Sequence, residues 1–389
     1  MRTLRDMALA APLLLFLVLV FAWPILAFSY RAIDNGVLHR SFPATHAALQ
    51  DWDAPADVPP VAFDALARDL QGIGSPERVA VTARNLNNFL EGFRSLLMKT
   101  ANRLPPEQQA DWRDTFINID KRWGETKYWA VLKHETGALT PSFVLAALDL
   151  KLSDDGSVTR VAEERRLYVP LLWRTFEISF WVALICFVLG YPTAYVLTRL
   201  PPLAAGIGMI CVLLPFWTSL LVRTTAWIIL LQGNGPVNSL LQFVGLITEP
   251  LQLIFNRFGT LVAMSHVLLP YMILPLYSVM KLVPENQMLA AQSLGANIRV
   301  AFLRVYFPQT ASGVAAGLLL VFILALGYYI TPALVGGPSD QMLSYMITYH
   351  VNEVVNWGMA SALGVMLLIS TCVLLLVMSR FVKMRQLMR

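Results

Sequence analysis

Residues 284–308 read PENQMLAAQSLGANIRVAFLRVYFP. Pro284 suits the first turn of a helix, and Gly295 suits the position just after a helix ends. A second short helix is expected from about Asn297 to Pro308. The segment therefore predicts a helix, a glycine turn and a second helix.

Small and basic side chains flank this turn. Ala290 and Ala291 precede Gly295, whereas Arg299 and Arg304 follow it. Small side chains permit close approach of another chain, so the segment predicts a surface for a partner. An ordinary loop folded back toward the membrane is the alternative that the residues leave open.

Apolar sequence surrounds the segment on both sides. Of the 389 residues, 56% are hydrophobic and only 14% are charged, against about 25% charged in a soluble domain. A helix needs roughly 20 apolar residues to cross the hydrocarbon core of a bilayer. Uncharged stretches of that length occupy 7–30, 178–198, 200–222, 224–248, 258–280, 305–339 and 354–379. Helices are expected in them, because lipid cannot satisfy open backbone groups. The chain is predicted to be an all-α membrane protein.

About six transmembrane helices fit these stretches. The expected spans are 8–29, 172–198, one starting near 203, 258–281, 308–332 and 356–381. The third is ambiguous, because 203–231 suits either one long tilted helix or one span followed by a short segment at the interface. Gln232-Gly233-Asn234-Gly235-Pro236 should end it.

The charge is divided unevenly. Residues 31–170 hold 17 Lys/Arg and 19 Asp/Glu, whereas the rest of the chain holds 13 and 6. Basic residues near span ends mark the cytoplasmic side. With six spans, this places both termini in the cytoplasm of a bacterial inner membrane and the region after the first span in the periplasm. The positive excess thus indicates topology rather than nucleic-acid binding.

The polar region is predicted to be mainly helical. Ser75-Pro76-Glu77 is typical of a helix start. Apolar residues continue behind it at helical spacing from Leu86 to Leu97. A second amphipathic helix is expected from Pro105 and should carry Trp112, Phe116, Ile119 and Trp123 on one face.

The 284–308 segment resembles the EAA loop of ABC importer permeases. Ala290, Ala291, Gly295 and Pro308 fit its pattern. The family's glutamate falls on Leu289, a departure that puts one polar contact in doubt, and Glu285, one helical turn earlier, is a possible substitute. In the family this loop docks into a groove on the ATPase. The resemblance thus implies an ATPase-coupling loop made of Glu285, Leu289, Ala290, Ala291, Gly295, Arg299 and Pro308.

Three other stretches support the resemblance. GYPTAY at 190–195 is similar to a family motif at the cytoplasmic end of a span. LPFWTSLLVR at 214–223 and GYYITPALVGGPSD at 327–340 resemble permeases of spermidine/putrescine importers. The resemblance covers the first span and then about 140–385, and most of 31–139 lies outside it.

The resemblance implies the type I ABC importer transmembrane fold with an insertion. The domains would be 1–30 with the first span, a periplasmic insertion at 31–139, a linker at 140–171, and a core at 172–385. The function would be ATP-driven import, by alternating access, of polyamines or a related small organic solute. The implied partners are an ABC ATPase dimer, a second and different permease chain, a periplasmic binding protein and the bilayer.

No cofactor is expected in this chain. The sequence has no P-loop, so ATP and magnesium would belong to the ATPase. No nucleophile–base or metal-spaced set stands out, so neither an enzyme nor a metal site is predicted. A stand-alone secondary transporter or channel is the alternative function, although such proteins often show repeated halves and none is seen here.

Charged and aromatic residues in or beside the spans are the candidates for the solute pathway. Arg223 and Glu177 are expected to pair, either to brace the bundle or to contact solute. If the cargo is a polycation, Asp340 and Glu353 are expected to contact it. The aromatic candidates either bind cations or pack between helices; they are Phe216, Trp217, Tyr328 and Tyr329.

Overall fold

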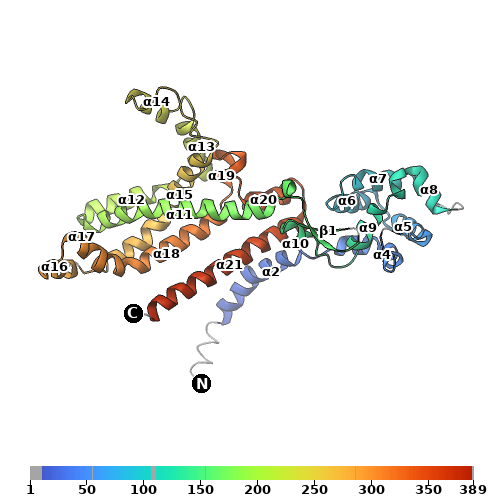
Figure 1. The fold of residues 1–389 in the computed structure, drawn as a ribbon, viewed down its shortest axis with the longest axis horizontal. Helices are drawn as coiled ribbons and strands as arrows, with labels where there is room; N and C mark the ends of the chain where they lie inside the picture. Colours follow the sequence, from blue (N-terminus) through green and yellow to red (C-terminus); the bar gives the residue numbers. More distant parts are fainter. Residues whose placement is uncertain (1–10, 55, 107–110, 154, 285, 388–389) are drawn as a thin grey trace, which may run out of the picture. The chain divides into compact units, whose positions relative to one another are not determined.

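A computed structural model describes residues 11–387, apart from 55, 107–110, 154 and 285 (Figure 1). The chain forms two compact units. One unit comprises the chain up to Val169 together with the part from Met346 onward, and the other is Pro170–Tyr345. Each is described by itself.

The Pro170–Tyr345 unit is entirely helical in its described residues. Its elements are α11 (Tyr168–Arg199), α12 (Pro202–Trp217), α13 (Leu220–Leu231), α14 (Pro236–Phe243), α15 (Arg257–Met280), α16 (Asn286–Ser293), α17 (Ile298–Ala301), η4 (Phe302–Tyr306), α18 (Phe307–Leu326), α19 (Ile330–Val335), η5 (Pro338–Asp340) and α20 (Leu343–Asn352), which continues into the other unit.

Helices α15 and α18 lie side by side and form the centre of this unit (Figure 1). Two glycines of α18 allow their close approach. A Cβ on Gly317 would lie 2.7 Å from the sulfur of Met272, and one on Gly313 would lie 3.0 Å from Cβ of Val279. The Gly313-x-x-x-Gly317 pattern therefore serves helix packing, as small residues do in membrane bundles.

Five of the described helices are long and apolar enough to cross a membrane. They are Ala11–Tyr30, Tyr168–Arg199, Arg257–Met280, Ile298–Leu326 and Trp357–Val377. The count becomes six when Pro202–Trp217 and Leu220–Phe243 are taken as one broken span. The expectation of about six spans is therefore met.

The ambiguous third span is broken. Helix α12 ends at Trp217, and the following helical segment is bent away from it by 101°. Thr218 and Ser219 adopt extended backbone at the break. A single straight helix over 203–231 is thus wrong, and the alternative of one span followed by a second segment is closer to the structure.

The other unit contains the polar region and the first and last long helices. Its elements are η1 (Val18–Ala22), α2 (Trp23–Tyr30), α3 (Gly36–Ser41), α4 (Pro43–Leu49), α5 (Pro60–Gly72), α6 (Pro76–Asn87), α7 (Phe93–Arg103), α8 (Trp112–Ile119), η2 (Lys121–Gly124), α9 (Thr126–Glu135), α10 (Ser142–Ala147), β1 (Leu150–Leu152), β2 (Val158–Arg160), η3 (Glu163–Arg165) and α21 (Trp357–Leu387). Strands β1 and β2 form an antiparallel hairpin that pairs Leu150 with Arg160.

Residues 31–139 build their own aromatic core. The rings of Phe63 and Trp129 lie 4.4 Å apart, and those of Phe116 and Trp123 lie 5.3 Å apart. Phe93 is also fully buried in this cluster. This region is therefore folded around a core of its own and is not an extended loop.

Two helix predictions in this region need correction. Ser75 caps α6 as expected, because its side chain accepts a hydrogen bond from the Arg78 amide. The apolar run up to Leu97, however, is split between α6 and α7 by Gly92, whose φ is +86°. Likewise α8 ends at Ile119, so Trp123 lies in the separate 3₁₀ turn η2. Part of the expected helix, 107–110, lies outside the described residues.

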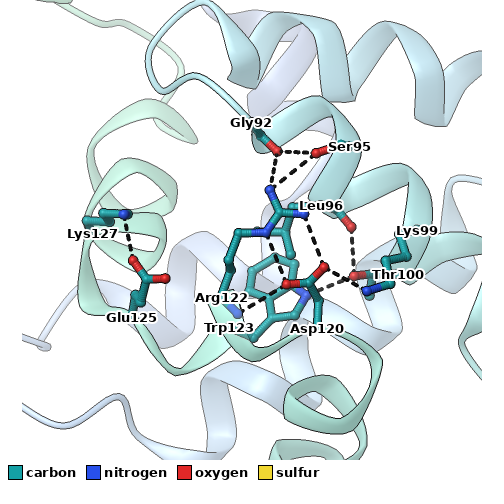
Figure 2. A network of polar contacts seen from close by, with 10 residues as sticks. All are labelled: Gly92, Ser95, Leu96, Lys99, Thr100, Asp120, Arg122, Trp123, Glu125 and Lys127. Atoms are coloured by element: carbon teal, nitrogen blue, oxygen red, sulfur yellow. Dashed lines mark hydrogen bonds and ion pairs between the residues drawn. The ribbon is translucent and has the colours of Figure 1, made fainter.

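A polar network fixes that second break (Figure 2). The Asp120 carboxylate accepts hydrogen bonds from Lys99 Nζ at 2.9 Å and from Arg122 Nε at 3.0 Å. Arg122 in turn donates to the Gly92 carbonyl at 3.0 Å. Hydrogen bonds from the Arg122 guanidinium hold the pKa of the Asp120 carboxyl well below its usual range. The network therefore connects the turn at Gly92 with the turn η2, neither of which was predicted.

Helix α21 packs against α2 and α10 within this unit. The α10 ring of Phe143 occupies the space that a Cβ on Gly358 would need, and Arg31 lies over the Trp357 ring at 5.4 Å. A Cβ on Gly364 would lie 3.2 Å from the Phe28 ring. The stretch 140–171 thus contains a helix and a hairpin that contribute to the folded unit.

Candidate functional site

The predicted coupling segment forms a helix, a turn and a second helix. Gly295 ends the first helix with a φ of +91°, in the left-handed region where a side chain costs about 1–2 kcal/mol. The Ala296 amide donates to the Ala291 carbonyl at 3.0 Å, which is the closing bond of a glycine C-cap. Asn297 then caps α17 by accepting from the Val300 amide at 2.9 Å. The local sequence therefore specifies the turn.

Aromatic contacts anchor the segment to α11. Tyr191 and Tyr195 of α11 pack their rings edge-to-face against Phe302, at 6.1 Å and 5.8 Å. Tyr195 also meets the ring of buried Tyr306 at 5.4 Å. The Tyr191 hydroxyl lies 3.0 Å from that of Thr310, at the start of α18. The segment is therefore held in place by the rest of its unit.

The segment exposes four large apolar side chains. Leu294 is 90% exposed, and Leu289, Ile298 and Leu303 are each more than 60% exposed. Exposed Arg299 and Arg304 lie on the same segment. Large exposed apolar side chains gathered within one short segment indicate an interaction surface. We call Leu289, Leu294, Ile298 and Leu303 the apolar ridge.

The remaining loop candidates are placed as follows. Ala290 is exposed and Ala291 is half-buried. Pro308 lies shortly after the π-helical turn η4, inside a helix that runs without a break over Ile298–Leu326. The expected separate short helix ending at Pro308 is therefore wrong. Glu285, the suggested substitute for the family glutamate, lies outside the described residues. Leu289, at the family's glutamate position, faces outward.

A cavity of about 260 Å³ lies among α12, α13, α15 and α18. It brings together three of the pathway candidates, Phe216, Arg223 and Tyr328. The Phe216 ring lies 4.9 Å from that of Tyr271, which the sequence did not single out. The other lining residues are Val267, Leu268 and Leu324. The cavity is thus mainly aromatic and aliphatic, with one cationic group.

The other pathway candidates do not line this cavity. Trp217 is 74% exposed, and Tyr329 precedes α19. Glu353 is exposed and belongs to the other unit.

The predicted Arg223–Glu177 pair is wrong. Glu177 instead pairs with Arg257, whose Nη1 lies 3.0 Å from its Oε1. Arg257 Nε also donates to Asp340 Oδ1 at 2.7 Å. Arg257 stands directly before the uncharged run of α15, a position that marks it as a helix-end charge. Arg257 reaches these two partners only because α15, α11 and the turn before α20 pack together, although they lie far apart in the sequence.

This network holds Asp340 away from solvent. Asp340 is 2% exposed, and its second oxygen accepts the Gly337 amide at 3.2 Å. A Cβ on Gly337 would lie 2.6 Å from the Phe255 carbonyl oxygen, so the backbone there is tightly packed. The network braces the turn between α19 and α20.

Two solved ABC transporter structures match part of this chain. One is a bacterial alginate transporter in complex with an alginate-bound periplasmic protein, with a TM-score of 0.44, 15% identity, and coverage of 54% of this chain and 76% of that one. The other is a bacterial transporter for alginate import, with a TM-score of 0.45, 15% identity, and coverage of 57% and 79%.

Curated relatives are closer in sequence. The spermidine/putrescine transport system permease protein PotB of Haemophilus influenzae is 31% identical over 214 residues, which cover 55% of this chain and 75% of that protein. PotB of Escherichia coli is 31% identical, with coverage of 54% and 77%. The Escherichia coli inner membrane ABC transporter permease protein YdcU is 30% identical, with coverage of 52% and 69%.

The family profile of binding-protein-dependent transport system inner membrane components matches residues 167–385. That match begins where α11 begins and includes the anchored segment with its apolar ridge. Residues 31–139 lie outside it. The chain therefore belongs to the family of binding-protein-dependent transport system inner membrane components, the permeases of ABC importers.

Proposed function

We propose that this chain is the membrane-spanning permease subunit of an ATP-driven importer for polyamines or a related small organic solute. A separate ATPase hydrolyses ATP, with its magnesium, and a periplasmic binding protein delivers the solute. The family match and the relatives named as spermidine/putrescine permeases support this assignment. A second permease chain, different from this one, completes the pathway.

The observation that carries the proposal is the apolar ridge on an anchored helix pair. Uncovered leucines on a surface segment are costly in water unless a partner covers them. The aromatic contacts to α11 and the continuation into α18 join that surface mechanically to the bundle. The segment is therefore suited to pass a movement of the ATPase to the helices.

Alternating access follows from this connection. ATP binding closes the ATPase dimer, and the docked segment moves with it. A ligand shifts an equilibrium only by binding two states unequally, so the ridge contacts the ATPase differently in the inward-open and outward-open states. The bundle then exposes its cavity to one side at a time.

In the orientation that we propose, the coupling segment and both termini lie in the cytoplasm. Basic residues lie at the corresponding ends of the spans, including Arg199, Lys281, Arg299 and Arg304. The folded region within residues 31–139 is then periplasmic, on the side from which the binding protein arrives.

Co-purification with the ATPase tests the proposal. Leu294→Asp places a charge on the most exposed residue of the ridge, and Gly295→Asp adds a charge and backbone strain at the turn. Burial of one leucine contributes about 1.5–3 kcal/mol, so Leu294→Asp should weaken ATPase binding about tenfold or more. Gly295→Asp should also weaken it, because the strained turn disturbs the surface that docks.

The matched control is Val61→Asp. Val61 is also an exposed apolar residue, but it lies in the first turn of α5, within the insertion. The control should retain the ATPase, and all three variants should still insert in the membrane. If no ATPase accompanies the native chain, or the ridge variants keep it as well as the control does, the proposed function is wrong.

A further inference from the structure

The cavity among α12, α13, α15 and α18 is lined by one cation, the guanidinium of half-buried Arg223. Its Nε and Nη1 are buried and have no hydrogen-bond partner among the described residues. A buried guanidinium normally has a carboxylate or several acceptors around it, because an uncompensated charge is costly. The described part of the chain therefore supplies no hydrogen-bond acceptor to these two nitrogens.

The acidic residues that could balance Arg223 are committed elsewhere. Glu177 and Asp340 both bind Arg257, at 3.0 Å and 2.7 Å. The residues lining the cavity, all of them described, include no aspartate or glutamate. The positive charge is thus left facing the cavity.

The remainder of the cavity suits the body of a small solute. Phe216, Tyr271 and Tyr328 provide aromatic faces, and Val267, Leu268 and Leu324 provide aliphatic ones. Its volume of about 260 Å³ is below the 300–1,000 Å³ of pockets for drug-sized ligands. Aromatic faces attract ammonium groups, and a guanidinium binds carboxylates with paired hydrogen bonds.

We propose that this cavity binds the carboxylate end of a small solute on Arg223, with the amine or aliphatic remainder against the aromatic side chains. The inference rests on the proposed permease function and deepens it by naming the substrate chemistry. A plain diamine offers no acceptor to a guanidinium. Among solutes related to polyamines, an ω-amino carboxylate supplies both ends.

Ligand protection of Arg223 tests this without requiring transport. Phenylglyoxal modifies guanidinium groups, and mass spectrometry reports modification at each arginine. The probes are 4-aminobutyrate and putrescine, which share a four-carbon chain but differ by one carboxylate in place of one aminomethyl end. The sample is the full transporter in lipid nanodiscs.

We expect 4-aminobutyrate to lower the modification of Arg223 severalfold and putrescine to leave it unchanged. Exposed Arg94, in the insertion, should react equally in every sample. The proposal is overturned if putrescine protects as well as the carboxylate, if neither protects, or if Arg223 does not react because a partner subunit's carboxylate already covers it.

Transport by the reconstituted complex provides the second readout. A hydrogen bond to a charged group contributes about 10- to 100-fold in binding, so Arg223→Gln should reduce 4-aminobutyrate import by that factor. Arg223→Lys should retain part of it, and Arg94→Gln should match the native chain. Equal import by the Arg223→Gln variant and the native chain would contradict the proposal.

The two proposals fail differently. If no ATPase binds, the importer function is wrong, but protection of Arg223 by 4-aminobutyrate would still show a carboxylate site. Normal ATPase binding with no protection of Arg223 removes only the carboxylate site.

Discussion

At the scale of the residue, tertiary packing determines which charged side chains of this chain form ion pairs. Arg257 binds two acids that come from α11 and from the turn before α20, while Arg223 binds none among the described residues. The sequence identifies each of these residues as a charge near or in a span. It does not reveal which charges pair, because that depends on side-chain reach between segments far apart in the chain.

The Asp120 carboxylate gives a residue-scale prediction. Asp120→Asn keeps a side chain that can cap η2 but removes the charge facing Lys99 and Arg122. Because these partners are partly exposed, we expect a loss of about 1 kcal/mol in local stability at neutral pH. Hydrogen exchange of residues 93–123 in the full-length chain measures it.

The stability difference between the native chain and the Asp120→Asn variant should depend on pH in one direction. The folded-state pKa of Asp120 is lowered, so its contribution is present above the unfolded value of about 3.9 and is lost as pH falls through the folded value. The native chain and the Asp120→Asn variant should therefore converge in strong acid. As a control, Glu125→Gln alters an exposed pair with Lys127 and should change little. A difference that persists unchanged in acid would show that the charge is not responsible.

At the scale of the element, local signals predict helix ends where they carry their own chemistry. Ser75 and Gly295 could each be identified from residue type and spacing. The helix end expected at Pro308 is absent, because the helix continues from Ile298 to Leu326. Gly92 could not be distinguished from a glycine tolerated within a helix, because the Arg122 contact that fixes it comes from 30 residues away. The break after Trp217 contains no glycine, so residue type alone does not mark it.

Gly92→Ala tests the importance of the left-handed turn between α6 and α7. The new alanine would have a φ of +86°, and its Cβ would lie 3.2 Å from Arg122 Nη1. The backbone strain costs about 1–2 kcal/mol, so exchange of the α7 amides should accelerate about tenfold.

The matched change is Gly72→Ala, at the end of α5. No described atom outside its own helix turn lies within 4 Å of the place that the new Cβ would take. It should leave exchange unchanged or slightly slower. If Gly92→Ala behaved in the same way, the turn would not require glycine.

At the scale of the whole molecule, the apolar stretches, the family match and the anchored segment describe a permease with an added folded region. The hydropathy of the sequence is sufficient to predict the unbroken spans, because a helix that crosses the bilayer needs a fixed length of apolar residues. It does not settle the third span, which is broken after Trp217. The internal structure of the insertion was only partly predictable, since its helices end where long-range polar contacts require it.

Cross-linking of the apolar ridge to the ATPase tests the central claim most directly. The native cysteines Cys186, Cys211 and Cys372 are first replaced by alanine or serine, and Leu289→Cys is then introduced. With a short cross-linker that carries a maleimide at one end and a photoreactive diazirine at the other, this variant should cross-link to the ATPase with a yield that differs between ATP and ADP, whereas Val61→Cys should not. A Leu289→Cys variant that never cross-links to an ATPase, or does so no better than Val61→Cys, would contradict the assignment of this segment as the coupling element.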